Sequence, residues 1–275
     1  MRHDGKVCQV FDKTFREVDY KNIKLLTKEE NCSIIIIVRK QRRNTMGHFV
    51  GKFLYGSQNY GLSTPESDKD YKWVEVPDWN ELFYRETLNR QVDENNSVWD
   101  LRDFCKNLMK ANPNALELLF SVEQEYFDEE LKELLDFVRE NVGALVRVHW
   151  KEFSSAVHGV AWNGVKRNGE NPKTVSRLVY FWLLWLSLIG DNDVHGSGTN
   201  GEMTEETWRN SGRKWPQQIR SHETLTEDDE FTLFWVGHDW YPSNWHIDPQ
   251  EGDEEKCKEV EQRFKAYFAN YLTNH

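Results

Sequence analysis

Two carboxylates and a Gly-Ser turn lie close together between His48 and Pro77, in a spacing that suits metal and phosphate chemistry. Asp68 and Asp70 are two residues apart, so on a strand both side chains would point to one face. Neighbouring carboxylates repel each other unless a cation lies between them, and Mg²⁺ typically takes carboxylate oxygens together with substrate phosphates. Gly56 and Ser57 offer backbone N–H groups and a hydroxyl to phosphate oxygens. The stretch therefore predicts a site for a nucleotide and a metal ion.

Two strands must position these groups. Phe49 to Tyr55 is a short apolar run that ends at the Gly-Ser turn, and Tyr71 to Val76 follows the second carboxylate directly. Aromatic and β-branched residues recur in both runs, which is typical of strands. The segment between them is rich in turn-forming residues, namely Gly61, Ser63, Thr64, Pro65 and Ser67.

A resemblance to a known family is carried by two segments, GSQNYGLSTPESDKDYK at residues 56–72 and NPNALELLFS at residues 112–121. They are similar to the RlaP-like predicted nucleotidyltransferases of bacteria and their phages, within the DNA polymerase β-type nucleotidyltransferase superfamily. The first motif of that group reads Gly-Ser-x-x-Tyr-Gly-x-x-Thr-Pro-x-Ser-Asp-x-Asp, and every position matches here. Lys69 departs from the superfamily, which more often has an apolar residue there. We expect it to face solvent or, if buried, to pair with a carboxylate or a phosphate.

The resemblance implies that an acceptor hydroxyl attacks the α-phosphate of a nucleoside triphosphate such as ATP, with release of pyrophosphate. Two Mg²⁺ ions, or Mn²⁺ in their place, would support the reaction. Asp68 and Asp70 would bind both ions, and Glu117 would be the third carboxylate and would help to deprotonate the hydroxyl. Glu117 lies in the apolar run Ala115–Phe120, which we expect to be a strand. The alternative is a charge that faces water on an edge strand.

The same resemblance suggests a set of nucleotide-binding residues: Gly56, Ser57, Tyr60, Ser67, Lys173 and Arg177. Ser57 and nearby N–H groups would hold the β- and γ-phosphates, and Tyr60 would pack against the sugar or the base. Lys173 and Arg177 are one turn apart on one face of a predicted helix, where basic charge opposes the helix dipole. The alternative is an ordinary solvated first turn.

These patterns predict a mixed α+β fold, with a small nucleotidyltransferase sheet flanked by helices and a mainly helical C-terminal domain. The boundary is expected near Phe127, giving domains at residues 1–127 and 128–275. Ser33–Val38 is a β-branched run that could add a buried strand. Helices are expected over Val98–Met109, from Asp128 through Val138, and over Ala144–Lys166, Asn171–Ile189, Thr204–Trp215 and Asp253–Leu272.

Composition limits the partners. The 275-residue chain has a net charge of −11, which argues against a non-specific nucleic-acid coat. A basic cluster at Arg39, Lys40, Arg42 and Arg43 is either a solvated loop or a substrate-binding patch. The four cysteines (Cys8, Cys32, Cys105 and Cys257) lack zinc spacing, and we expect free thiols. The polar start and the shortness of the apolar run Leu178–Ile189 predict a soluble cytoplasmic protein with no membrane partner.

The acceptor is left open by the residues. An RNA 3′ end is favoured by analogy with the family's presumed role in RNA repair, and a small molecule such as an aminoglycoside or a protein side chain is the alternative. A toxin-like enzyme would use the same chemistry, and a non-catalytic nucleotide-binding module is a hypothesis of another class. His195 and Asp193 could bind a metal or belong to a polar loop. The aromatic-rich Phe231–Pro249 could stack a base or a glycan, or fill a core.

Overall fold

The structure is a computed structural model that describes residues 48–77, 89–189, 201–210, 214–240 and 246–274. All of them belong to one compact unit, Gly47–His275. The predicted strand Ser33–Val38, the basic cluster at residues 39–43, and His195 with Asp193 lie outside the described residues. No outcome is therefore assigned to these three predictions.

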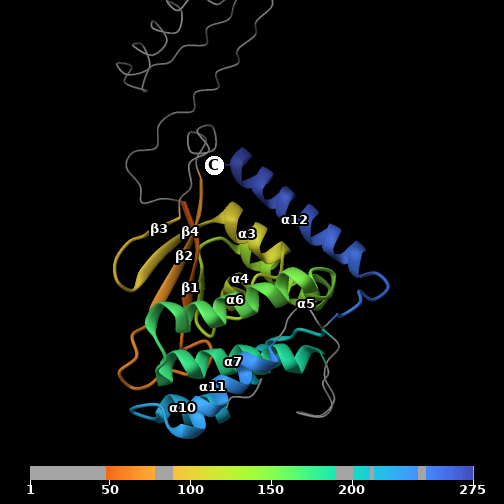
Figure 1. Ribbon diagram of the computed structural model, residues 1–275. Helices are drawn as coiled ribbons and strands as arrows, with labels where there is room; N and C mark the ends of the chain where they lie inside the picture. Colours follow the sequence, from red (N-terminus) through yellow and green to blue (C-terminus); the bar gives the residue numbers. More distant parts are fainter. Residues whose placement is uncertain (1–47, 78–88, 190–200, 211–213, 241–245, 275) are drawn as a thin grey trace, which may run out of the picture. The chain divides into compact units, whose positions relative to one another are not determined.

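A five-stranded mixed sheet carries the predicted site (Figure 1). The strands follow the order β3-β4-β2-β1-β5. β1 pairs antiparallel with β2 and with β5, β2 pairs parallel with β4, and β3 pairs antiparallel with β4. Tyr55 at the end of β1 lies opposite Asp70 at the start of β2. The strands are β1 His48–Tyr55, β2 Asp70–Val76, β3 Arg90–Gln91, β4 Asn96–Asp100 and β5 Gln124–Tyr126.

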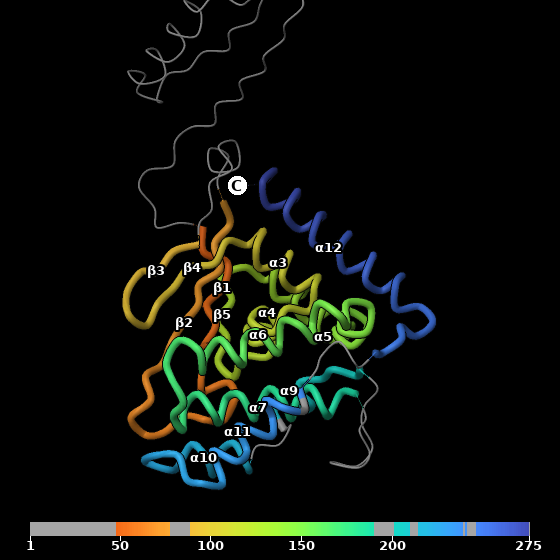
Figure 2. Tube along the Cα trace, viewed as in Figure 1, coloured from red at the N-terminus to blue at the C-terminus, as the bar shows by residue number. Residues whose placement is uncertain are grey.

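Helices make up most of the rest of the described chain. α3 and α4 pack against one face of the sheet, and α7 packs against α6, α10 and α11 (Figure 2). The C-terminal α12 packs along α5. This arrangement confirms the predicted α+β class with a helical C-terminal region. The helices are α3 Leu101–Met109, α4 Pro113–Leu119, α5 Glu129–Val148, α6 Trp150–Asn168, α7 Pro172–Ile189, α9 Glu205–Asn210, α10 Lys214–Ser221, α11 Glu227–Asp239 and α12 Asp253–Asn274.

Two predicted helix starts are confirmed by their caps. The Asp128 carboxylate accepts a hydrogen bond from the backbone N–H of Leu131 at 3.1 Å and caps α5. The Asn171 side chain accepts from the N–H groups of Lys173 at 3.0 Å and Thr174 at 3.1 Å, with Pro172 in the first position of α7. α7 is buried on nearly all sides, as its continuous apolar sequence predicts.

Four predicted elements are wrong in kind or extent. The helix expected over Ala144–Lys166 crosses the break at His149, where α5 ends and α6 begins. Val98 lies on β4, so the helix expected from there begins only at Leu101. The run Ala115–Phe120, expected as a strand, belongs largely to α4, because Asn112 caps a helix there and Pro113 opens it. The helix expected to end before Pro216 is two helices, α9 and α10, and that proline sits in the first turn of the second, where no N–H is needed.

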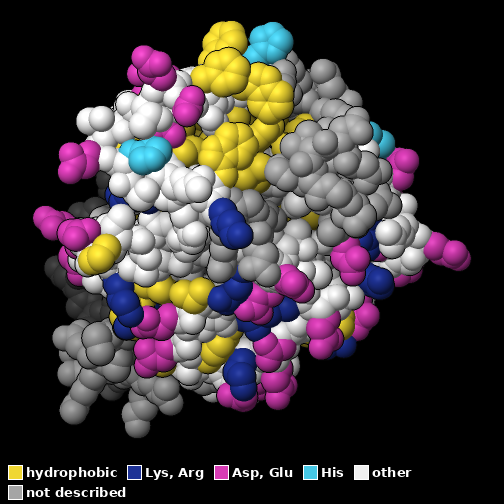
Figure 3. Space-filling view, turned by 90° about the horizontal axis from the view of Figure 1, so that it is seen from below, with side chains coloured by type: hydrophobic (Ala, Val, Ile, Leu, Met, Phe, Trp, Pro, Cys, Tyr) yellow, Lys and Arg dark blue, Asp and Glu magenta, His cyan; other side chains and the backbone are white. Residues whose placement is uncertain are grey.

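The aromatic-rich segment Phe231–Pro249 divides between core and surface. Trp240 is buried, whereas Phe231, Phe234 and Trp235 of α11 are the exposed large hydrophobic residues there. Figure 3, seen from the side of α10 and α11, shows hydrophobic side chains gathered in one patch. Residues 241–245 lie outside the described part of the chain.

Two further predictions concern the environment of the chain. Cys105 and Cys257, the cysteines within the described ranges, are free thiols as expected. Among the helices that the structure describes, none combines the length and the apolar character needed to cross a membrane.

Candidate active site

The Gly-Ser turn forms where β1 ends. Gly56 has φ +90°, a conformation that other residues rarely adopt, and a Cβ there would lie 3.3 Å from Asp70 Oδ2. The carbonyl of Gly56 accepts from the N–H of Asn59 at 3.0 Å, and that of Ser57 accepts from Leu62 at 2.9 Å. The backbone therefore turns tightly beside a carboxylate, as the motif predicts.

The two motif aspartates differ in their surroundings. Asp68 is exposed and lies in the loop just before β2, so the strand geometry that would place both carboxylates on one face does not extend to this residue. Asp70 is half-buried at the first position of β2. Burial raises the pKa of Asp70, Lys173 opposes the rise, and the charge of Asp68 adds to it. Lys69 between them is exposed, as one alternative predicted, and pairs with Glu123 at 2.8 Å.

Glu117 is a buried carboxylate on α4, only 3% exposed. The backbone N–H of Gly56 donates to its Oε1, and the Tyr60 hydroxyl donates to its Oε2. Burial raises the pKa of Glu117, while the Arg177 guanidinium and these hydrogen bonds oppose the rise. Glu117 thus ties the Gly-Ser turn to the helix layer.

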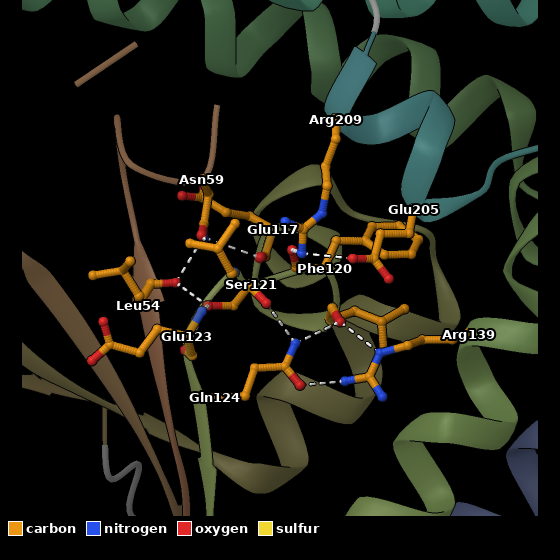
Figure 4. A network of polar contacts seen from close by, with 12 residues as sticks. Leu54, Asn59, Glu117, Phe120, Ser121, Glu123, Gln124, Arg139, Glu205 and Arg209 are labelled. Atoms are coloured by element: carbon orange, nitrogen blue, oxygen red, sulfur yellow. Dashed lines mark hydrogen bonds and ion pairs between the residues drawn. The ribbon is translucent and has the colours of Figure 1, made fainter. Parts of the chain in front are cut away.

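Asn59 is a positioning residue that sequence reasoning missed. Its buried side chain donates to the Leu54 carbonyl at 2.7 Å and the Glu117 carbonyl at 3.3 Å, and accepts from the Val122 N–H at 3.1 Å. Figure 4 shows Asn59 beside Leu54, Glu117 and Ser121. The Ser121 hydroxyl reaches the same Leu54 carbonyl at 2.7 Å. The end of β1 is therefore held to the segment that follows α4.

The predicted basic pair on α7 is brought to the carboxylates. Lys173 is exposed in the first turn of α7, and its charge lowers the pKa of Asp70 against the effect of burial. The Arg177 guanidinium lies 5.5 Å from the ring centre of Tyr60, and its charge acts on Glu117. The helical half thus supplies cations to an acidic site that belongs to the sheet half.

Two other predicted nucleotide-binding residues make contacts within the protein. Tyr60 is 1% exposed, with its ring centre 5.0 Å from that of Tyr180 and 5.3 Å from that of Phe181. Ser67 accepts a hydrogen bond from the Thr64 N–H at 2.8 Å and so shapes the loop before Asp68. The structure therefore places Tyr60 in an aromatic core and Ser67 in a turn.

Lys72 is a second residue that the sequence analysis did not single out. It follows Asp70 by two positions on β2, so both side chains point to one face of the sheet. Its ammonium lies 4.7 Å from the centre of the Trp99 ring and 5.0 Å from that of Tyr55. Burial lowers its pKa, and the charge of Glu117 opposes this. The alternation Asp-x-Lys along a strand was the signal that could have found it.

Asp68, Asp70 and Glu117 differ in how well they fit a divalent metal ion. The repulsion between Asp68 and Asp70 is the electrostatic feature that a divalent cation would relieve, so this pair fits such an ion. Glu117 fits less well, because both of its oxygens already accept hydrogen bonds within the protein. Within the described ranges, no group of three or more His, Cys, Asp or Glu side chains is arranged to hold a metal ion.

The residues of this site lie in a segment that matches the model of a known family. Residues 46–178 match the model of RlaP, described as an RNA repair pathway DNA polymerase beta family. An uncharacterized 38.9 kDa protein of enterobacteria phage T4, from the nrdC-mobD intergenic region, is 25% identical over 117 residues, or 38% of this chain. The match spans only 35% of that relative's length. No solved structure matches the chain. The matched residues, which include the whole predicted site from Gly56 to Arg177, are similar to the RlaP family of DNA polymerase beta type.

Proposed function

We propose that this chain is a nucleotidyltransferase that transfers a nucleoside monophosphate from a nucleoside triphosphate to a hydroxyl acceptor. A bond forms between the acceptor oxygen and the α-phosphorus, the bond from that phosphorus to the bridging oxygen breaks, and pyrophosphate leaves. The family match supports this class of reaction. The observation that carries the proposal is the meeting of Asp70, the Gly56 turn and the α7 cations in one place.

The acidic residues of the site would bind the metal ion, and its basic residues and N–H groups would bind the phosphates. Asp68 and Asp70 would hold a divalent cation, Mg²⁺ or Mn²⁺, which when bound makes the acceptor hydroxyl easier to deprotonate and offsets phosphate charge. Ser57 and the backbone N–H groups of the turn would bind phosphate oxygens, and Lys173 would add positive charge where negative charge develops. A second ion, and Glu117 as the third carboxylate that completes the site of the first ion, stay predictions, since Glu117 accepts two hydrogen bonds in the structure.

We favour an RNA 3′ end as the acceptor. The support is the RNA repair pathway in the description of the family. The net charge of −11 weighs against long nucleic acid, so a short or locally bound end suits the chain better. A protein side chain or a small molecule uses the same chemistry and becomes a distinct outcome of the test.

The test is a transfer assay with each α-labelled ribonucleoside triphosphate, Mg²⁺ or Mn²⁺, and cell extract as the source of acceptor. An Asp68→Asn/Asp70→Asn double variant runs beside the wild type, with Lys69→Met as the matched control from the same loop. We expect label in ribonuclease-sensitive material for the wild type and the control only.

Other outcomes decide between the alternatives. Protease-sensitive label would identify a protein acceptor, and a small labelled product would identify a small-molecule acceptor. Absence of transfer under all conditions, with triphosphate binding that survives the double substitution, would overturn the enzyme and favour a nucleotide-binding module.

A further inference from the structure

Lys72 is a cation in the middle of the sheet. It pairs with Phe53 of β1 on one side and with Ser97 of β4 on the other, so β2 carries it between two neighbouring strands. Its side chain is on the same face as that of Asp70, which helices α3 and α4 help to cover. Lys72 is half-buried, and a lysine that is withdrawn from water usually pairs its charge with an anion.

The surroundings of the ammonium hold it in place without neutralising it. The rings of Trp99 and Tyr55 lie 4.7 Å and 5.0 Å away and attract the cation through their faces. Within the described part of the chain, no carboxylate lies within 4.0 Å of it and it donates no hydrogen bond. The ammonium therefore keeps its donors available for a ligand.

The anionic groups nearest in the site are already engaged. Glu117 acts on Lys72 through its charge, but its oxygens accept from Gly56 and Tyr60. Asp70 lies against Gly56 and is subject to the charge of Lys173. An anion from outside the protein would be the partner that Lys72 lacks, and the ligand class that this site is built for carries phosphates.

We propose that Lys72 binds the triphosphate of the nucleotide, with its ammonium donating to phosphate oxygens. This assignment rests on the proposed function, since it places the triphosphate beside Asp70. Lys72 and Lys173 then approach the phosphates from different layers, one from the sheet and one from α7. The ammonium of Lys72 lies over two aromatic rings, so the charged end of the side chain has a defined position.

The proposal is tested by binding rather than by turnover. Isothermal titration calorimetry in the presence of Mg²⁺ compares the wild type with Lys72→Met, Lys72→Arg and Lys69→Met. The ligands are inorganic tripolyphosphate, each of the four ribonucleoside triphosphates, and the matching nucleosides. Methionine keeps most of the length of the lysine side chain and removes its charge. We expect Lys72→Met to weaken tripolyphosphate and nucleotide binding by about 10- to 100-fold, the effect of losing one charge-assisted hydrogen bond. We expect Lys72→Arg to restore most of the affinity and Lys69→Met to match the wild type.

The outcomes separate this inference from the function itself. If Lys72→Met is folded and binds tripolyphosphate like the wild type, the inference is overturned while the transfer assay still decides the function. If wild type binds neither a nucleotide nor tripolyphosphate, both are overturned. If Lys72→Met does not unfold in a cooperative transition, Lys72→Gln is measured instead.

Discussion

The role of Glu117 as an anchor predicts a specific loss of stability. Glu117→Ala removes the acceptor of the Gly56 N–H and of the Tyr60 hydroxyl, and it removes the counter-charge of Arg177. Both donors lie in or beside a core in which Tyr60 is 1% exposed, so water cannot readily replace the carboxylate. Glu117→Gln keeps the shape and one acceptor oxygen.

The magnitude follows from these contacts. A hydrogen bond to a charged group contributes about 1.5–3 kcal/mol to stability, and Glu117→Ala removes two such bonds. The variant also no longer buries a carboxylate, which offsets part of this loss. Breaking a buried charge network by removing one partner typically costs about 3–5 kcal/mol, which we expect for Glu117→Ala. For Glu117→Gln we expect about 1–2 kcal/mol, because one donor loses its acceptor.

Urea unfolding measured by tryptophan fluorescence checks these values. Glu133→Ala is the matched control, since Glu133 is exposed in the middle of α5 and should change the free energy of unfolding by less than about 0.5 kcal/mol. A loss below about 1 kcal/mol for Glu117→Ala would mean that the Gly-Ser turn does not depend on this carboxylate.

Two other predictions concern buried polar contacts. Asn59→Ala should cost about 1–3 kcal/mol in a urea titration because the Val122 N–H loses its acceptor, whereas exposed Asn114→Ala should cost less. Arg147→Met should cost about 3–5 kcal/mol at neutral pH, because it leaves Asp253, which it binds at 2.7 Å and 2.9 Å, buried and unpaired. The Arg147 hydrogen bond holds the pKa of Asp253 below its ordinary value of about 3.9, so the stability that this pair contributes is present above that pH and lost as the pH falls below it. Acid titrations of wild type and Asp253→Asn should show this loss in the wild type only.

Local signals account for the parts of the fold that the sequence predicted. β1 and β2 are apolar runs bounded by turn residues. The capping residues Asp128 and Asn171 indicate where α5 and α7 begin, because each accepts a hydrogen bond from the first turn of its helix. Gly56 is informative because both its positive φ and its contact with Asp70 exclude a side chain. For the strands and the caps, the determining interaction lies within a few residues of the signal.

Other features were not predictable because their cause lies far along the chain. The six-residue run Ala115–Phe120 does not by itself distinguish a buried strand from a buried helix, and the cap Asn112 with Pro113 favoured the helix that carries Glu117. Asn59 occupies a variable position of the motif, and its partners Leu54, Glu117 and Val122 come from three elements or turns. The Asp-x-Lys alternation could have pointed to Lys72, but its contact with Trp99 depends on the pairing of β2 with β4.

The site also bears on how the chain should be divided. The boundary expected near Phe127 stays a prediction, yet the family match continues to residue 178 and so includes the first turns of α7 with Lys173 and Arg177. Beyond the match, Gln217 of α10 donates to the Gly61 carbonyl at 3.0 Å, and Arg220 donates to that of Leu62 at 3.2 Å. The loop that leads to the aspartates is therefore held by α10, a helix on the far side of that boundary. Residues 1–127 alone would keep both aspartates and lose their cations and their support, so we predict that a fragment with the proposed activity must include the helical half.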